Sequence, residues 1–222
     1  MSGDTVKRRY DSPARAQAAL ETRRRIRAAA AELFVASGYA ATSMKAIAAA
    51  AGVSERTVFL VFPTKAALLG ECIRVAVRGD DEATPLLARD DFRTALEAPP
   101  NRMLGRLADA STALMGRAAR LLAVGEAVGP DDPVLGAVRA RGHAATRADM
   151  LEVARALERA GALREGMSAE PAADAMYALA ASESVYIRLV HHQGRSPEDY
   201  ARMLERALAG ALRAERRAGD PP

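Results

Sequence analysis

The chain has 222 residues, of which 50% are hydrophobic and 27% are charged, and its formal net charge is +4. This length and composition allow one large or two smaller packed domains and argue against disorder over most of the chain. No apolar run approaches the ~20 residues that a membrane-spanning helix needs, and residues 1–9 are not followed by the apolar stretch of a secretory signal. We therefore expect a cytoplasmic protein with no membrane partner.

The residue types favour an all-α fold. Aromatic residues make up 4% of the chain, tryptophan is absent, and the residues that favour strands are scattered among abundant Ala and Leu. Cys72 is the only cysteine, which excludes an intramolecular disulfide and fits a reducing compartment. We expect Cys72 to be a small buried apolar group, and a redox switch is the alternative.

The charge is unevenly distributed along the chain. Residues 1–70 contain 11 Lys and Arg against 5 Asp and Glu, whereas the remaining residues contain 21 against 23. A basic N-terminal third on a slightly acidic body predicts that the first part of the molecule meets a polyanion and that the rest does not.

In chain order, the first predicted feature is a flexible basic arm at residues 1–14, which carries a run of basic residues and lacks helical periodicity. A helix is predicted from Arg15 to Ser37, because apolar residues recur there at three- and four-residue spacing. Gly38 follows as a stop of the left-handed kind.

Two short helices are predicted next, over 44–51 and 55–61. Ser43 and Ser54 each precede one of them, and serine is a residue type that caps helix N-termini. Gly52 lies between the two helices and supplies the turn.

Pro63 breaks the chain, and Thr64 can cap a fourth helix that fades near residue 79. We assign residues 15–63 to an N-terminal domain and residues 64–217 to a larger helical domain, with 64–79 as a bridging helix. The second domain is predicted to contain a long helix after Pro99 and Pro100 and further helices over 135–160, 172–192 and 197–215, separated by loops at 129–133 and 164–171.

Two helices joined by a turn that contains Gly describe a helix-turn-helix motif. Basic residues flank this one, in the arm and at Arg23, Arg24 and Arg25. Its second helix opens with short or charged polar side chains, the end that would enter a major groove. Helix N-termini also offer backbone N–H groups to phosphates. The pattern therefore favours DNA binding.

The stretch from Thr22 to Leu69, TRRRIRAAAAELFVASGYAATSMKAIAAAAGVSERTVFLVFPTKAALL, resembles the DNA-binding domain of the TetR family of one-component repressors. The resemblance covers about a fifth of the chain without a gap. It implies an N-terminal three-helix domain that binds DNA and a C-terminal helical domain for effector binding and dimerisation. It also implies a homodimer on a palindromic operator, formed through residues 172–192 and 197–215.

The resemblance nominates residues for DNA contact. Arg56 is the best candidate to grip a guanine, because a guanidinium can donate to O6 and N7 together. The base-contact candidates are Lys45, Glu55, Arg56 and Thr57, and the phosphate-contact candidates are Arg23, Ser43, Ser54, Thr64 and Lys65. Ser54 is a helix cap in either case, whereas Arg23 and Lys65 can instead be ordinary surface groups.

The middle of the second short helix departs from the family pattern, which often has Tyr and other polar or aromatic residues there. This chain has Phe59, Leu60 and Val61. Phe59 lacks a hydroxyl for a phosphate, whereas Leu60 can still contact a thymine methyl. Phe59 and Phe62 can both be core residues, and we expect Phe62 to pack under the first helix. Arginines would then supply more of the affinity and make binding strongly salt-dependent.

The second domain offers candidates for contact with a small-molecule effector, which we expect to be lipophilic: Met103, Leu107, Met115, Met150, Met176, Tyr177 and Glu183. Flexible Met side chains recur at promiscuous binding surfaces, but ordinary core is the default interpretation of these Met residues and of Tyr177. Glu183 can meet a cationic ligand, lie exposed, or pair across a dimer interface.

Enzyme chemistry finds little support in the sequence, because it has no phosphate-binding loop, nucleophile elbow or metal-spaced set of Cys and His. We expect no catalytic residue, no cofactor and no metal. The leading hypothesis is a ligand-responsive repressor, in which an effector moves the fourth helix by a population shift. The alternatives are an effector-independent activator or architectural DNA binder, and a helical interaction protein or enzyme with a vestigial motif.

Overall fold

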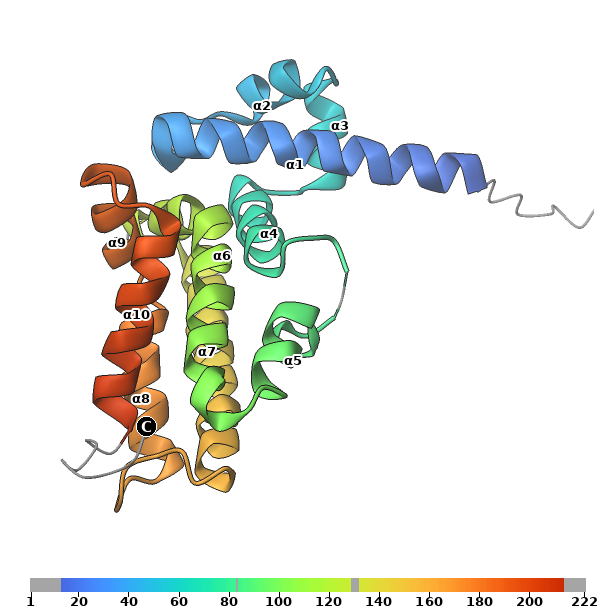
Figure 1. Cartoon of the computed structure of the whole chain (residues 1–222). Helices are drawn as coiled ribbons and strands as arrows, with labels where there is room; N and C mark the ends of the chain where they lie inside the picture. Colours follow the sequence, from blue (N-terminus) through green and yellow to red (C-terminus); the bar gives the residue numbers. More distant parts are fainter. Residues whose placement is uncertain (1–12, 83, 129–131, 214–222) are drawn as a thin grey trace, which may run out of the picture. The chain divides into compact units, whose positions relative to one another are not determined.

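The computed structural model describes residues 13–82, 84–128 and 132–213, and these form helices and loops without any strand. The predicted all-α fold is confirmed. The chain divides between Leu69 and Gly70 into two compact units, whose helices are labelled in Figure 1. Residues 1–12 of the predicted arm and 214–217 of the predicted second domain lie outside the described residues.

The first unit begins with the long helix α1 (Pro13–Ala41), on which α2 (Met44–Ala51) packs, and α3 (Glu55–Val61) packs on α2. Its core consists of apolar side chains that are almost fully buried: Ile26, Ala30, Phe34, Ile47, Ala48, Val58, Phe62 and Leu68. Gly38 interrupts α1 with φ 78° and ψ 170°, a conformation that glycine reaches without the steric cost of a side chain. The predicted helix stop at Gly38 is therefore a kink after which the helix resumes briefly.

Local signals set the limits of α2 and α3. Ser43 Oγ accepts a hydrogen bond from the backbone N–H of Ala46 at 3.1 Å, and Ser54 Oγ accepts one from that of Thr57 at 3.1 Å. Gly52 takes a left-handed conformation with φ 64° at the end of α2. Each cap satisfies an N–H group that has no partner inside its helix. The predicted ranges 44–51 and 55–61 are confirmed.

The second unit is a bundle of longer helices. Figure 1 shows α6, α7, α8 and α10 side by side, and α5 packs against α6. From the N-terminus, the elements are α4 (Lys65–Arg78), whose first turn belongs to the first unit, the 3-10 turn η1 (Leu86–Ala88), α5 (Asp90–Leu96), α6 (Pro100–Ala127), α7 (Pro133–Arg159), α8 (Ala169–Ala180), α9 (Glu183–Tyr186), the π-helical segment η2 (Ile187–His192) and α10 (Pro197–Leu212).

Amphipathic patterning explains the core of this bundle. Leu104, Leu107, Leu114 and Ala118 recur along one side of α6, and all four are buried. Leu204, Leu208 and Leu212 do the same along α10 at four-residue spacing. Cys72 is buried in α4, as expected for a small apolar group.

The prediction of one continuous helix over residues 172–192 is wrong. The structure breaks it at Ala181 and Ser182, where the backbone leaves helical angles, and then continues as α9 and the π-helical η2. Ser182 Oγ accepts a hydrogen bond from Val185 N–H at 3.4 Å and so caps a new helix. Serine competes for backbone hydrogen bonds in this way, which favours a break over a continuous helix. The short elements η1 and α5 were not predicted from the sequence.

Across the described residues, no helix is both long enough and apolar enough to cross a membrane. Within the same ranges, no three or more Cys, His, Asp or Glu side chains gather into a group that could hold a metal ion.

Candidate functional site

Helix α3 presents an exposed surface that mixes charged and apolar side chains. Val58 is completely buried and anchors the helix, whereas Glu55 and Arg56 are exposed. Phe59 is 46% exposed and Leu60 is 75% exposed, which is unusual for large apolar side chains. Phe59 therefore does not belong to the core of the first unit, whereas Phe62, which is 2% exposed, is buried as expected.

Polar side chains at the N-terminus of α3 hold one another in place. Ser54 Oγ lies 2.8 Å from Thr57 Oγ1, in addition to capping the helix. Thr64 makes the equivalent cap at the start of α4, where its Oγ1 accepts a hydrogen bond from Ala67 N–H at 3.0 Å. These caps define where α3 and α4 begin. The N-terminus of a helix presents backbone N–H groups, which can bind an anion.

Lys65 forms hydrogen bonds inside the first unit. Its Nζ donates to the carbonyl oxygens of Tyr39 at 2.8 Å and Thr42 at 2.9 Å, and it lies 4.2 Å from the centroid of the Tyr39 ring. The Thr42 hydroxyl donates to Gly38 O at 2.8 Å in the same corner. The phosphate contact predicted for Lys65 stays a prediction, because two of its three N–H groups already serve the fold.

The remaining DNA candidates on α1 and α2 differ in how they are held. Lys45 is exposed on α2. Arg23 is partly buried, and its guanidinium lies 4.5 Å from the centroid of the Phe62 ring. A cation over an aromatic face is attracted by the ring quadrupole, so this contact fixes the orientation of Arg23.

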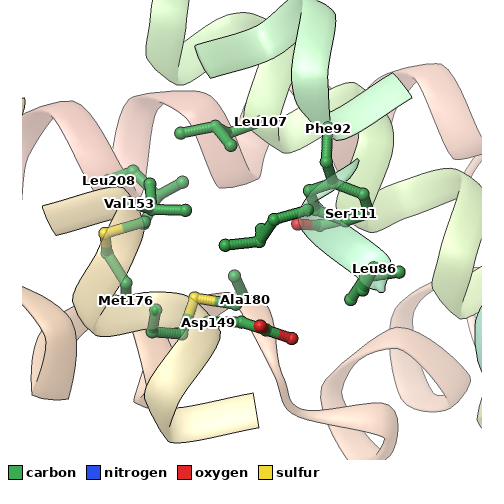
Figure 2. Close-up of a pocket in the computed structure, with 11 residues that line it drawn as sticks. Leu86, Phe92, Leu107, Ser111, Asp149, Val153, Met176, Ala180 and Leu208 are labelled. Atoms are coloured by element: carbon green, nitrogen blue, oxygen red, sulfur yellow. The ribbon is translucent and has the colours of Figure 1, made fainter. Parts of the chain in front are cut away.

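The second unit contains a small apolar cavity, shown in Figure 2. Its volume is about 10 Å³, close to the minimum for a single water molecule. The lining comes from η1, α5, α6, α7, α8 and α10 and consists of Leu86, Leu87, Phe92, Leu107, Ser111, Asp149, Met150, Val153, Met176, Ala180 and Leu208.

Three of the predicted effector contacts, Leu107, Met150 and Met176, meet at this cavity. Met103 and Met115 are also buried but do not line it. The other two lie outside it and have polar partners: the Tyr177 hydroxyl is hydrogen-bonded to His143 Nδ1, and Glu183 accepts from Ser184 Oγ at 3.1 Å.

Asp149 is the ionisable residue of the lining, and it was not among the predicted effector contacts. It is partly buried on α7, and burial raises the pKa of its carboxyl group. A signal was present in the sequence, because Asp149, Val153 and Leu157 recur at four-residue spacing, and both apolar members are buried.

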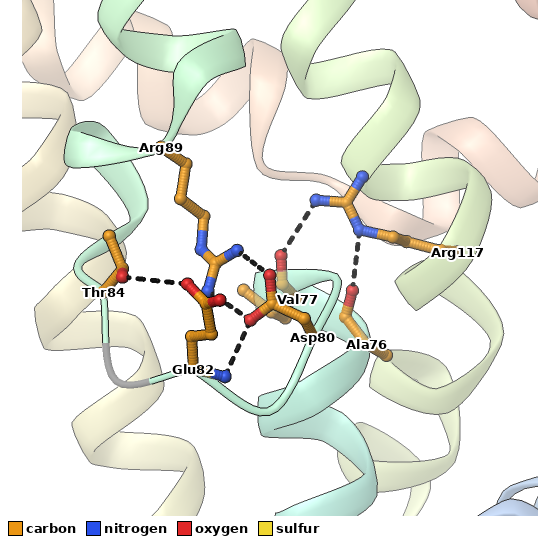
Figure 3. Close-up of polar contacts among 7 residues, drawn as sticks. All are labelled: Ala76, Val77, Asp80, Glu82, Thr84, Arg89 and Arg117. Carbon is orange, nitrogen blue, oxygen red and sulfur yellow. Dashed lines mark hydrogen bonds and ion pairs between the residues drawn. The ribbon is translucent and has the colours of Figure 1, made fainter.

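Polar contacts at the end of α4 join it to α5 and α6, as Figure 3 shows. Arg117 of α6 donates from Nε to Ala76 O at 3.0 Å and from Nη2 to Val77 O at 3.2 Å. Burial lowers the pKa of the Arg117 guanidinium. These bonds satisfy two carbonyls that a helix C-terminus leaves open.

An ion pair fixes the loop that follows α4. Both guanidinium ends of Arg89 donate to the Asp80 carboxylate, one of them at 2.7 Å. The hydrogen bond from Arg89, with a second from the Glu82 backbone, lowers the pKa of Asp80 to about 2. Arg89 directly precedes α5, so α4 and the cavity-lining segment η1–α5 are joined by this pair.

Comparison with known proteins agrees with this geometry. Residues 26–72 match the sequence model of the bacterial regulatory proteins of the TetR family. Among curated proteins, no match to the chain was found.

Solved structures share the fold of most of the chain. NalD, the secondary repressor of the MexAB-OprM multidrug efflux pump in Pseudomonas aeruginosa, is 23% identical with a TM-score of 0.68, and the match covers 90% of this chain and 100% of that one. A transcriptional regulator from Saccharomonospora viridis in complex with choline is 20% identical with a TM-score of 0.67, covering 88% and 100%. A TetR-family regulator from Rhodococcus sp. is 19% identical with a TM-score of 0.67, covering 87% and 99%.

Proposed function

We propose that the chain is a TetR-family transcriptional regulator, a homodimeric repressor that binds a palindromic operator through its helix-turn-helix domain and is released by a small molecule. The observation that carries the proposal is the surface of α3. This helix is anchored by Val58, capped by Ser54, and exposes Arg56, Phe59 and Leu60.

The proposed contacts follow from the chemistry of that surface. Arg56 can read guanine in the major groove, and Leu60 can contact a thymine methyl. The capped N-termini of α2, α3 and α4 can donate backbone N–H groups to phosphates, beside Ser43, Ser54 and Thr64. Glu55, Thr57 and Lys45 complete the proposed base contacts.

Dimerisation is proposed through residues 172–192 and 197–215, within which α8 and α10 are the long helices. Both helices keep partly exposed apolar side chains, among them Ala175, Leu179, Met203 and Ala211. A dimer also matches the twofold symmetry of a palindrome, whose half-sites are spaced by one or more helical turns.

The proposed response to an effector runs through α4. The effector would occupy an enlarged form of the cavity in Figure 2, displacing η1 and α5. Arg89–Asp80 and Arg117 join the cavity-lining elements to the end of α4, and α4 continues into the DNA-binding unit. An effector shifts this equilibrium only by its difference in affinity for the two states. The choline-bound neighbour supports the view that this fold can hold a small organic molecule.

A second candidate function is an effector-independent DNA binder, acting as an activator or an architectural protein. The observation that favours it is the cavity volume of about 10 Å³, because a core so nearly filled has no ready space for an organic ligand.

DNase footprinting of the full chain on the DNA upstream of its own gene tests the proposal. The repressor predicts a protected palindrome, and a screen of small molecules should find one that removes the protection. Protection that no ligand alters would favour the second candidate. Absence of any sequence-specific protection would contradict both.

A further inference from the structure

The exposed face of α3 changes character from one helical turn to the next. Its first turn carries the charged residues Glu55 and Arg56, and both are exposed. Its second turn carries Phe59 and Leu60, which are apolar and also exposed. Residues four apart lie on the same side of a helix, so each apolar residue continues the line of one charged residue. The face therefore has a charged half and an apolar half.

The core of the first unit does not account for the apolar half. Val58 in the helix and Phe62 at its C-terminal end are almost fully buried and already pack into that core. Turning α3 to bury Phe59 and Leu60 would expose Val58, so the fold cannot use both sides of the helix. The first 70 residues are also basic, with 11 Lys and Arg against 5 Asp and Glu. The partner that fits this face is a polyanion that also presents apolar groups.

The major groove of DNA offers both kinds of contact. A G·C pair presents two acceptors on guanine and an amino donor on cytosine, which suit an arginine and a glutamate respectively. The C5-methyl group of thymine is an apolar group at the edge of the same groove. A cytosine that is methylated at C5 presents this group at the same place. The order of side chains along α3 can therefore match an order of base pairs.

We propose that α3 reads a composite half-site, in which Glu55 and Arg56 select G·C and in which Phe59 and Leu60 select the C5-methyl group of a nearby pyrimidine. This inference rests on the proposed DNA binding and names the chemical groups that are read. Residues four apart are separated by about 6 Å along a helix axis, and successive base pairs by about 3.4 Å along DNA. The methylated pyrimidine therefore lies within about two base pairs of the guanine.

Binding-site selection from random duplexes with the full chain tests the order of the base pairs. The selected half-site should contain a guanine with a thymine within about two base pairs of it. A selected site without such a thymine would overturn the inference and leave the proposed DNA binding intact. If no sequence is selected at all, the proposed function fails together with the inference, so the two failures are distinguishable.

Replacing each thymine of the selected site by deoxyuridine, one position at a time, removes only the methyl group. At the thymine that the second turn of α3 contacts, this change should weaken binding about fourfold in one half-site, the effect expected for one buried methyl group. The same change in both half-sites should weaken binding about fifteenfold. Fluorescence anisotropy measures these affinities. The inference is wrong if deoxyuridine is tolerated at every thymine of the site.

A cytosine in place of that thymine separates the methyl group from the rest of the base. A pair of 5-methylcytosine with guanine at this position should bind about fourfold more tightly than an unmethylated C·G pair. Equal affinity of the two duplexes would show that the methyl group is not read, and would overturn the inference.

Variants of α3 assign the effect to the protein side chains. In Leu60→Ala or in Phe59→Ala, or in both, the difference between thymine and deoxyuridine should shrink, because the apolar contact is lost. Val134→Ala, which shortens an exposed apolar residue of α7, should keep the wild-type affinity and the full difference. Thermal unfolding confirms that each variant folds. A difference that persists unchanged in both α3 variants would come from the shape of the DNA and would contradict the proposal.

Discussion

At the scale of single residues, polar groups that are buried without a partner are the most informative. Tyr200 of α10 is completely buried, and within the described residues its hydroxyl has no hydrogen-bonding partner. Its ring packs edge to face against Tyr186, with the centroids 4.9 Å apart. Burial raises the pKa of the Tyr200 hydroxyl. The ring therefore contributes to the core, whereas the hydroxyl opposes burial.

Tyr200→Phe should leave the free energy of unfolding unchanged or raise it by about 1 kcal/mol, because removing an unsatisfied buried hydroxyl removes its desolvation cost. Tyr177→Phe is the control, since the Tyr177 hydroxyl is hydrogen-bonded to His143, and it should be neutral or slightly destabilising. Urea unfolding measures both. A clear loss of stability in Tyr200→Phe would show that the hydroxyl has a partner.

Asp149 predicts a pH effect on stability. Its pKa is raised in the folded chain by burial, so between the ordinary aspartate pKa and the raised value the folded state binds more protons than the unfolded state. The contribution of Asp149 to stability therefore falls as pH rises through this window and stays low above it.

The difference in unfolding free energy between Asp149→Asn and the wild type should thus grow from pH 3 to a plateau near neutral pH, in favour of the variant. Other groups titrate in both proteins and cancel. A difference that is constant over this range would mean that burial does not disfavour the ionised carboxylate.

At the scale of elements, much of the fold was predictable because its signals are local. Ser43, Gly52 and Ser54 fix the ends of α2 and α3 through side-chain caps and a left-handed glycine, and both ranges were predicted correctly. The break at Ser182 was missed, because serine is compatible with a helix until tertiary packing favours the cap. The hydrogen bonds of Lys65 and the place of Asp149 in the cavity lining were not predicted, because each depends on residues distant in sequence.

The hydrogen bonds of Lys65 join the start of α4 to the C-terminal end of α1. Lys65→Met should lower the stability of the first unit by about 1.5–3 kcal/mol, because two hydrogen bonds from a charged donor are lost. Lys45→Met, an exposed change of the same kind, should have little effect on stability. Chemical unfolding monitored in the first unit distinguishes them. Equal stability of the two variants would leave Lys65 as a surface group.

At the scale of the whole molecule, the charge asymmetry decides where a polyanion can bind. The basic residues of the first 70 positions include Arg23, which is oriented over Phe62, and Arg56, which is exposed on α3. The rest of the chain is slightly acidic and carries the cavity. This separation suits a protein that binds DNA with one unit and a small molecule with the other.

Operator binding should be strongly salt-dependent, because Phe59 and Val61 cannot donate hydrogen bonds to phosphates and cations must supply the affinity. A plot of log affinity against log salt concentration should have a slope steeper than about −3. Each phosphate that the protein neutralises contributes about −0.9 to this slope. Fluorescence anisotropy gives the slope when it is measured from about 50 to about 300 mM salt, where the affinity for DNA depends strongly on the salt concentration. A slope equivalent to one or two phosphates per dimer would contradict the claim that cationic side chains supply most of the affinity.

The most direct test of the central claim, that the exposed surface of α3 reads DNA, is the operator affinity of Arg56→Ala beside Arg120→Ala. Arg120 is an exposed arginine of α6, so the two variants lose the same charge at different places. Arg56→Ala should weaken operator binding by about 1–3 kcal/mol, roughly 5- to 150-fold, and relax the preference for the operator over random DNA. Arg120→Ala should bind like the wild type. Equal operator affinities for the two variants would contradict the claim.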